Sequence, residues 1–218
     1  SQPVTRAHLP HSKMRIFLLA LLSTSSTAIF LHCEFAFDSW SPIGNVYICR
    51  ATPLDVSVNQ THVLGYYGTH AAGYLSSDVK AIWFRANCDQ LTHVPRGLLD
   101  FFPNIVEISI HYCGIVTLSG HELEEYPKLQ SWTMPGTEVE KIPGNFFKPT
   151  PDMAFVGFQN NKIKYVGRKL LESLTKLQKV NFQENVCIND FSMNFNEVRK
   201  LIDGLKLKCA EGDETTTE

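Results

Sequence analysis

Apolar residues between positions 105 and 189 recur with a constant 24-residue period, as in Ile105, Leu129, Met153 and Leu177. When Ile105 is counted as the first position of a unit, the fourth, sixth and eleventh positions are apolar in four consecutive units. In an ordinary mixed domain, about ten apolar residues would have to coincide at this one spacing by chance. The repeat therefore predicts a stack of similar units, which together bury a core that no single unit can bury alone.

Each unit is predicted to contain one short strand followed by a returning loop. Side chains alternate along a strand, so the fourth and sixth positions face the core, while the third, fifth and seventh face outward on a shared sheet. The ninth position holds Cys113, Thr137, Asn161 and Asn185 in turn. An Asn side chain at that point can hydrogen-bond backbone groups that the turn leaves unpaired. The pattern predicts an α/β solenoid with a curved parallel sheet and about five repeats.

A less regular unit precedes these four. Counting back by one period from Ile105 places Ala81 at its first position, whereas hydrophobicity favours Val79 there. We adopt the second register, which gives a 26-residue unit and accommodates the extra length as a bulge. This register turns Trp83 and Arg85 onto the outward face. The repeats are then assigned to residues 79–186.

The amino-terminal segment is predicted to be a targeting sequence. Basic residues at positions 13 and 15 precede an apolar run, and small residues ending at Ala28 follow it. We interpret residues 14–28 as a signal peptide and residues 1–13 as leader or added sequence. The apolar run is shorter than the roughly 20 residues that a spanning helix needs, so we expect secretion without a membrane anchor. Residues 211–218 are acidic and contain no apolar side chain, which predicts a disordered tail.

The charge of the expected mature chain does not favour nucleic acid as a partner. The full sequence has 20 basic and 22 acidic residues, and the segment that ends at Ala28 contains three of the basic ones and no acid. The remaining 17 basic and 22 acidic residues give a formal charge of −5. Nucleic-acid recognition calls instead for a clustered basic face.

Six cysteines follow the predicted signal peptide, and an even number in an oxidising compartment predicts disulfides. Cys33 and Cys49 bracket alternating apolar residues around a Pro-Ile-Gly-Asn turn, which predicts a disulfide-closed hairpin. Cys187 and Cys209 bracket an amphipathic helical pattern, which predicts a helical cover at the other end. A stack of repeats exposes its core at both ends, so such covers are expected. The two caps are assigned to residues 29–78 and 187–210.

Cys88 and Cys113 lie near the same position of consecutive units. Neighbouring strands are about 4.8 Å apart, and this distance permits a disulfide between adjacent units. Both residues could instead be buried free thiols that fill turns in place of Asn. The sequence leaves these alternatives open. A metal site is not expected, because the cysteines lack a short-spaced second pair and the histidines are scattered.

Together these features resemble the extracellular class of leucine-rich-repeat proteins over roughly residues 33–209. The cap residues around Trp40 and Tyr47 are most similar to those of small secreted leucine-rich-repeat proteins of insects. This resemblance implies a repeat domain used for protein recognition, without catalysis and without a required cofactor. Thr137 in place of the usual Asn, and Trp132 in place of the usual Leu, depart from the pattern and put the regularity of that unit in doubt.

The outward columns of the predicted sheet form the candidate ligand-binding surface. Small uncharged residues occupy its centre, and aromatic side chains that can supply large contact areas flank them. Trp83 and Phe155 could instead pack against cap or loop residues and leave the sheet face merely solvated. The candidate ligand-binding residues are Trp83, Arg85, Glu107, Ser109, His111, Tyr112, Thr133, Phe155, Gln159, Lys179, Asn181 and Gln183.

Asn59 begins an Asn-Gln-Thr sequence in a polar stretch, which predicts an N-linked glycan in a secreted protein. The sequence contains no recognised catalytic motif, and a histidine such as His111 does not indicate an enzyme without a nucleophile motif or a pocket.

We therefore expect a secreted, non-enzymatic recognition module that binds an extracellular protein ligand through the concave sheet face, in immunity, signalling or adhesion. The alternative is a protein that binds glycan or extracellular matrix, because neutral amides and hydroxyls beside aromatic rings suit sugars. A structural role without a specific ligand is a third option.

Overall fold

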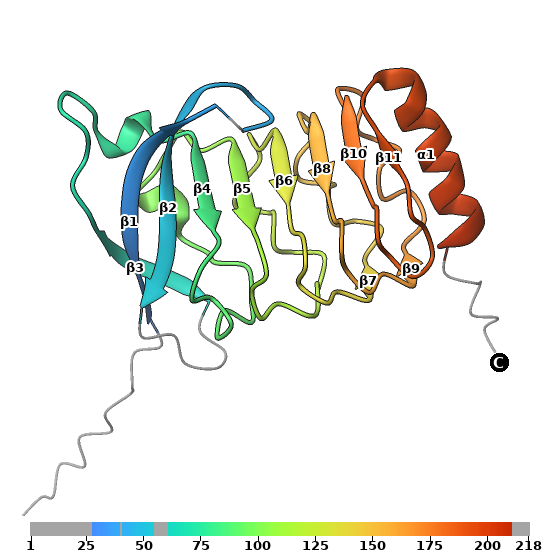
Figure 1. Ribbon diagram of the computed structural model, residues 1–218, viewed down its shortest axis with the longest axis horizontal. Coiled ribbons are helices and arrows are strands. Elements are labelled where there is room, and N and C mark those ends of the chain that lie inside the picture. The colour runs from blue at the N-terminus through green and yellow to red at the C-terminus, as the bar shows by residue number, and fades with distance from the viewer. Residues whose placement is uncertain (1–27, 40, 55–60, 211–218) are drawn as a thin grey trace, which may run out of the picture.

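The computed structural model describes residues 28–39, 41–54 and 61–210. The predicted leader, the predicted signal peptide except Ala28, the predicted glycan acceptor Asn59 and the predicted tail lie outside the described residues. The described chain forms a stack of coils, with a long sheet along one side and an α-helix at the carboxyl-terminal end (Figure 1). No helix in this part of the chain is long and apolar enough to cross a membrane.

Five short parallel strands form the central part of the sheet. The period of the repeat sets their register, because Glu107 pairs with Ser131, Ser131 with Phe155, and Phe155 with Lys179. Ala81 pairs with Glu107, which is a longer offset than in the later units and confirms the predicted register of the first unit. The strands are β4 (Ala81–Phe84), β5 (Glu107–Ile110), β6 (Ser131–Thr133), β8 (Phe155–Gly157) and β10 (Lys179–Asn181).

The core lies between the sheet and the returning loops. The inward side chains at the fourth and sixth positions of the last four units are fully buried, as the repeat predicted. Burying one large apolar side chain contributes roughly 1.5–3 kcal/mol, so stacking between units stabilises strands of only three or four residues. Within the returning loops, β7 (Lys141–Ile142) and β9 (Tyr165–Val166) pair as a small parallel sheet. The buried inward residues are Ile108, Ile110, Trp132, Met134, Val156, Phe158, Val180 and Phe182.

Asn161 and Asn185 hold the chain where it leaves the strands, as predicted. The Asn161 Oδ1 atom accepts hydrogen bonds from the backbone N–H groups of Thr137 at 3.0 Å and Val139 at 3.2 Å. Its Nδ2 atom donates to the carbonyl of Met134 at 2.7 Å. Asn185 makes equivalent bonds one unit later. Thr137 donates its hydroxyl to Asn161 at 2.9 Å, so the departure from Asn still links two neighbouring units.

The amino-terminal cap begins with the predicted hairpin. Its strands β1 (Ala28–Asp38) and β2 (Val46–Leu54) are antiparallel, and Cys33 forms a disulfide with Cys49. β2 also pairs with β4 in parallel, so the hairpin continues the long sheet. A further strand, β3 (His62–Tyr67), pairs in parallel with β1 and is not evident from the sequence.

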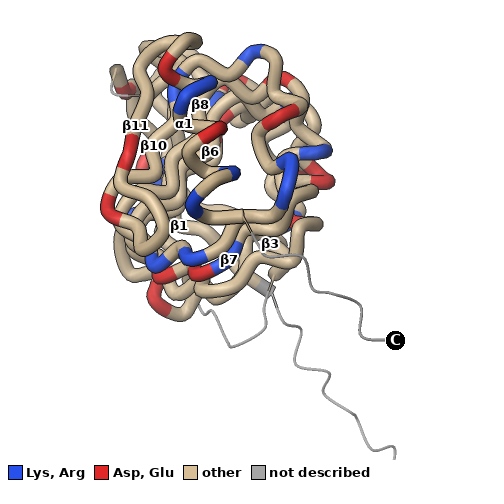
Figure 2. The backbone as a smooth tube through the Cα atoms, turned by 90° about the vertical axis from the view of Figure 1, so that its right-hand side faces the viewer, with Lys and Arg blue, Asp and Glu red and all other residues tan. Residues whose placement is uncertain are grey.

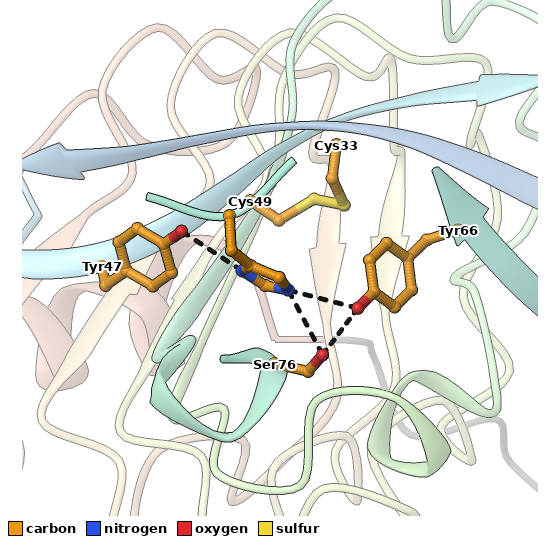
Figure 3. Close-up of a disulfide and its surroundings, with 6 residues drawn as sticks. Cys33, Tyr47, Cys49, Tyr66 and Ser76 are labelled. Atoms are coloured by element: carbon orange, nitrogen blue, oxygen red, sulfur yellow. Dashed lines mark hydrogen bonds between the residues drawn. A yellow bond between two sulfur atoms is a disulfide. The ribbon is translucent and has the colours of Figure 1, made fainter. Parts of the chain in front are cut away.

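Tyr47, Tyr66 and Ser76 lie around this disulfide (Figure 3), and each has its hydroxyl within hydrogen-bond distance of the His70 ring. The His70 ring stacks on Phe35 with the ring centroids 3.8 Å apart. The Nδ1 atom lies 3.2 Å from the Tyr47 hydroxyl, and the Nε2 atom lies 3.2 Å from the Tyr66 hydroxyl and 3.3 Å from the Ser76 hydroxyl. Burial lowers the pKa of His70. The histidine therefore holds the segment after β3 against the hairpin as a neutral ring.

The carboxyl-terminal cap contains the predicted helix. Asn194 caps the amino terminus of α1 (Phe195–Lys208) by accepting a hydrogen bond from a backbone N–H of its first turn. Cys187 and Cys209 form the predicted disulfide. Between them, β11 (Phe191–Ser192) pairs antiparallel with β10 and ends the sheet. The apolar stripe of α1 buries Val198, Leu201 and Leu205.

Elsewhere in the described chain there are two short 3₁₀ helices, η1 (Ser76–Asp78) and η2 (Leu98–Asp100).

A third disulfide joins Cys88 and Cys113, whose Cα atoms are 4.8 Å apart. Of the two alternatives that the sequence leaves open, the structure has the bonded one. The bond links the first two units just beyond the ends of β4 and β5. None of the six cysteines is therefore a free thiol.

Candidate binding surface

The outward side chains of the parallel strands form continuous rows across the sheet. The row at the third position consists of Ala81, Glu107, Ser131, Phe155 and Lys179, because the strand register aligns these residues. The predicted columns are therefore true neighbours, at the strand spacing of about 4.8 Å. They do not form one uniform surface, because the first half of the face is covered and the second half is open.

The connection between β1 and β2 covers the first half of the face. Ser41 in this connection donates a hydrogen bond to the Glu107 carboxylate, and the Trp83 Nε1–H donates to the same carboxylate at 2.7 Å. Trp83 and Glu107 are each only 1% exposed. Figure 1 shows the connection extending from β1 and β2 toward β6. The expectation that Trp83 and Glu107 are accessible is therefore wrong, and the alternative that Trp83 packs against the cap is confirmed.

Charged groups surround the buried carboxylate of this covered half. The Arg85 guanidinium lies 3.8 Å from the Trp83 ring centroid, a cation–π geometry, and Arg85 as a whole is exposed. Burial raises the pKa of Glu107, against the hydrogen bonds from Ser41 and Trp83 and the charge of Arg85, which lower it. The carboxylate thus joins the hairpin connection to the sheet, but at a desolvation cost.

Ser109 and Thr133, also predicted to be accessible, are buried beside His111. The Ser109 hydroxyl lies 2.6 Å from the His111 Nε2 atom and 2.6 Å from the Thr133 hydroxyl. Burial, together with the positive charge of Arg85, lowers the pKa of His111 to about 4. A nucleophile and a base are adjacent here, but Ser109 is enclosed, and among the described residues no carboxylate bonds to the His111 ring. The pair lacks the access and the orienting third group of a hydrolytic triad.

The second half of the face is open, and we call it the open patch. β8 and β10 supply its side chains, which are half-buried. β11 extends it, because Phe191 pairs with Asn181, and residues directly opposite each other in antiparallel strands point to the same face. Phe191 is 49% exposed and is absent from the predicted site, since two strand residues give no detectable alternation. The open patch consists of Phe155, Gln159, Lys179, Asn181, Gln183 and Phe191.

Tyr112 lies at the edge of the open patch and is 61% exposed. Its ring lies against Gly136, whose backbone N–H donates to the carbonyl of Gln159 at 3.2 Å. Tyr112 has a φ of +54°, and the equivalent eighth positions of the next three units, Gly136, Asn160 and Glu184, also have positive φ. The left-handed conformation is therefore a property of the repeat, and it places the Tyr112 side chain beside the patch.

Two buried polar atoms lie where the covered and open halves meet. Ser131 Oγ and Gln159 Oε1 have no hydrogen-bond partner among the described residues. An unsatisfied buried polar group costs about 1–3 kcal/mol. Ser131 is fully buried, whereas the Gln159 side chain is partly exposed, so a ligand that reached Gln159 Oε1 could recover part of this free energy.

The described part of the chain contains no group of three or more His, Cys, Asp or Glu residues that could hold a metal ion. The polar side chains of the open patch are the amides of Gln159, Asn181 and Gln183 and the amine of Lys179. This chemistry suits hydrogen bonding and apolar contact with a ligand.

No protein-family model matches the chain, and no curated protein matches it. Among solved structures, the chain is similar to one titled "Structure of the Toll - Spatzle complex, a molecular hub in Drosophila development and innate immunity", with 16% sequence identity and a TM-score of 0.45. The match covers 58% of this chain and 17% of that chain, so this chain spans a small part of its structural neighbour.

Proposed function

We propose that this chain is a secreted leucine-rich-repeat protein of about five repeats, which binds an extracellular protein ligand through the open patch and performs no catalysis. The observation that supports this proposal is that the exposed rings of Tyr112 and Phe191 and the half-buried ring of Phe155 lie on the same face as several neutral amides. Aromatic side chains on rigid elements supply much of the binding energy at protein interfaces. The three disulfides agree with an oxidising, extracellular destination, where immunity, signalling and adhesion are the fitting roles.

The side chains of the open patch indicate what its ligand offers. Phe155 and Phe191 present apolar surface at two points of the patch. Lys179 pairs with Phe155 across the strands, two residues before Asn181, the partner of Phe191. Lys179 forms no ion pair among the described residues. A protein segment with an apolar side chain, a nearby carboxylate and free backbone groups would complement this arrangement.

Affinity capture from the native extracellular fluid, using matched variants, tests the proposal. We expect Phe191→Ala and Tyr112→Ala each to lower the affinity for the captured protein at least about tenfold, or roughly 1.4 kcal/mol. Tyr165→Ala is the control, because Tyr165 is 49% exposed but lies on β9, away from the open patch. Retention of the partner by both patch variants, or equal loss with the control, would place binding elsewhere.

A salt titration of the same complex tests the role of Lys179. An ion pair between Lys179 and a ligand carboxylate should weaken as ionic strength rises. Lys179→Gln should therefore lower the affinity at low salt and make it less dependent on salt. An unchanged salt dependence would show that Lys179 does not face a charge.

Glycan binding is the second candidate function. The amides of Gln159, Asn181 and Gln183 lie beside aromatic side chains, and Gln159 Oε1 lacks a partner among the described residues. A neutral sugar needs such hydrogen bonds and an aromatic face. Binding to a glycan array that is insensitive to salt and lost in Gln183→Ala would favour this reading over protein recognition.

A further inference from the structure

A pocket of about 320 Å³ opens between α1 and the returning loop that follows β9. The helix packs against β10 and β11, and thus covers the sheet side of the last unit. The loop side of that unit is left with the pocket, which shares no residue with the open patch. The pocket walls are aliphatic and consist of Val166, Leu170, Leu171, Ile202, Leu205 and Ala210.

The mouth of the pocket is basic. Arg168, Lys169 and Lys206 line the pocket and have exposed side chains. Glu172 is the acidic residue among the lining residues, and its carboxylate pairs with Lys206 at 2.8 Å. Figure 2 views the stack from this end and shows several Lys and Arg segments there, together with acidic ones. Lys206 is paired with Glu172 and Arg168 also has a partner, so Lys169 supplies the positive charge of the mouth that no ion pair among the described residues offsets.

We propose that this pocket binds a small amphiphilic anion, with its apolar body against the aliphatic walls and its anionic head at the basic mouth. The volume lies at the lower end of the range of small-molecule sites, about 300–1,000 Å³. Burial of the apolar body supplies the main driving force, and the positive charge of Lys169 at the mouth selects the sign of the head. A medium-chain carboxylate has this combination of size and charge.

Residues 211–218 follow Ala210 directly and carry four acidic residues, so they are the other possible occupant. Their sequence contains no apolar side chain. They could pair with the basic mouth, but they offer nothing to the aliphatic walls. The chemistry of the walls therefore favours a separate amphiphile over this segment.

Calorimetric titration of the full chain with decanoate, below the concentration at which decanoate forms micelles, tests the proposal. We expect saturable binding at one site. Decan-1-ol and decylammonium, which keep the apolar body but lack the negative head, should bind at least about tenfold more weakly. Equal binding of all three compounds, or no saturable binding of decanoate, would overturn the proposal.

Matched variants locate the site. Ala210→Phe should fill the pocket and abolish decanoate binding, and Lys206→Gln should weaken binding several-fold by removing one positive charge. Lys164→Gln is the control, because Lys164 is exposed and ion-paired with Glu140 away from the pocket. Circular dichroism and Tm measurements check folding. If Ala210→Phe folds and binds decanoate normally, or if Lys206→Gln and Lys164→Gln behave alike, the assignment is wrong.

Two further variants separate the remaining occupants and the two proposals. A chain ending at Ala210 should bind decanoate with the affinity of the full chain. Binding only to the shortened chain would identify residues 211–218 as the occupant and overturn the proposal. Phe191→Ala should bind decanoate normally. Absence of decanoate binding would therefore contradict the pocket proposal alone, and absence of protein capture would contradict the open-patch proposal alone.

Discussion

The ring of Tyr112 occupies the space that a side chain at Gly136 would need. A Cβ added to Gly136 would overlap the Cδ1 and Cε1 atoms of the Tyr112 ring. Gly136 also has a φ of +67°, a conformation that residues with a Cβ adopt at a cost. The glycine therefore sets the position of an exposed aromatic side chain at the edge of the open patch.

Gly136→Ala should displace the Tyr112 ring and strain the backbone. We expect the free energy of unfolding to fall by about 1–2 kcal/mol, as measured by urea denaturation. If Tyr112 contacts the ligand, the variant should also lose affinity by about as much as Tyr112→Ala. An unchanged affinity with a displaced ring would show that Tyr112 does not contribute to binding.

Gly204→Ala provides a matched glycine control with the opposite expected sign. Gly204 lies inside α1, and its added Cβ would meet only Ile188 Cδ1 at 3.5 Å, an ordinary contact. Alanine is favoured over glycine in a helix by about 1 kcal/mol. The variant should therefore raise the free energy of unfolding and leave ligand binding unchanged.

Glu107→Gln should remove a pH dependence by which the native chain is more stable at low pH than at high pH. Burial raises the pKa of Glu107, so its contribution to stability is full below the ordinary value of 4.5 and is lost as pH rises through the raised value. A glutamine can still accept from Trp83 and bond to Ser41. We expect the variant to match the native chain near pH 4 and to exceed it in stability near pH 8, by about 1.4 kcal/mol for each unit of the native pKa shift.

Urea denaturation across this pH range checks the Glu107 prediction. Glu140→Gln is the control, since Glu140 is exposed and paired with Lys164 at 2.8 Å, and its loss should cost less than about 1 kcal/mol at any pH. A native chain more stable than Glu107→Gln at pH 8 would show that the charged carboxylate is favourable where it lies.

His111→Gln should change the pH dependence in the opposite direction. Burial lowers the pKa of His111 to about 4 from 6.5, so its contribution is full above 6.5 and is lost as pH falls through 4. The native chain should therefore lose on the order of 2 kcal/mol more than the variant between these limits, after allowance for its partial exposure. At neutral pH, where the native imidazole is uncharged, the two chains should differ little. Parallel stability curves would contradict the lowered pKa.

The stack itself could be predicted from the sequence because its determinants are local and repeated. The constant period fixes which side chains face inward, and the ninth-position Asn residues mark where each strand ends. Cysteine spacing and the helical pattern before Cys209 indicate both caps. Even the longer first unit follows from the alternation around Trp83.

The cover over half of the face could not be predicted in the same way. Periodicity gives the direction of the Trp83 side chain but not what packs on it. The cover depends on the contact between Ser41 and Glu107, which are 66 residues apart in the chain. β11 could not be predicted for a different reason: its two residues, Phe191 and Ser192, are too few to show the alternation of a strand.

The Asn161 side chain makes more hydrogen bonds than that of Thr137, the ninth-position residue of the preceding unit. Asn161→Ala removes the acceptor of two buried backbone N–H groups and the donor to the Met134 carbonyl. We expect the free energy of unfolding to fall by about 3 kcal/mol, since unsatisfied buried groups add to the lost bonds. Thr137→Val removes only the hydroxyl bond at 2.9 Å and should cost about 1 kcal/mol.

A double-mutant cycle by urea denaturation measures the link between these two residues. Because the Thr137 hydroxyl bonds to Asn161 itself, Thr137→Val should cost clearly less when Asn161 is already alanine. Asn185→Ala, at the equivalent but less buried position, should lie between the two single variants. Additive costs in the cycle would mean that the two side chains stabilise the turn independently, and equal costs for Asn161→Ala and Thr137→Val would contradict the ranking.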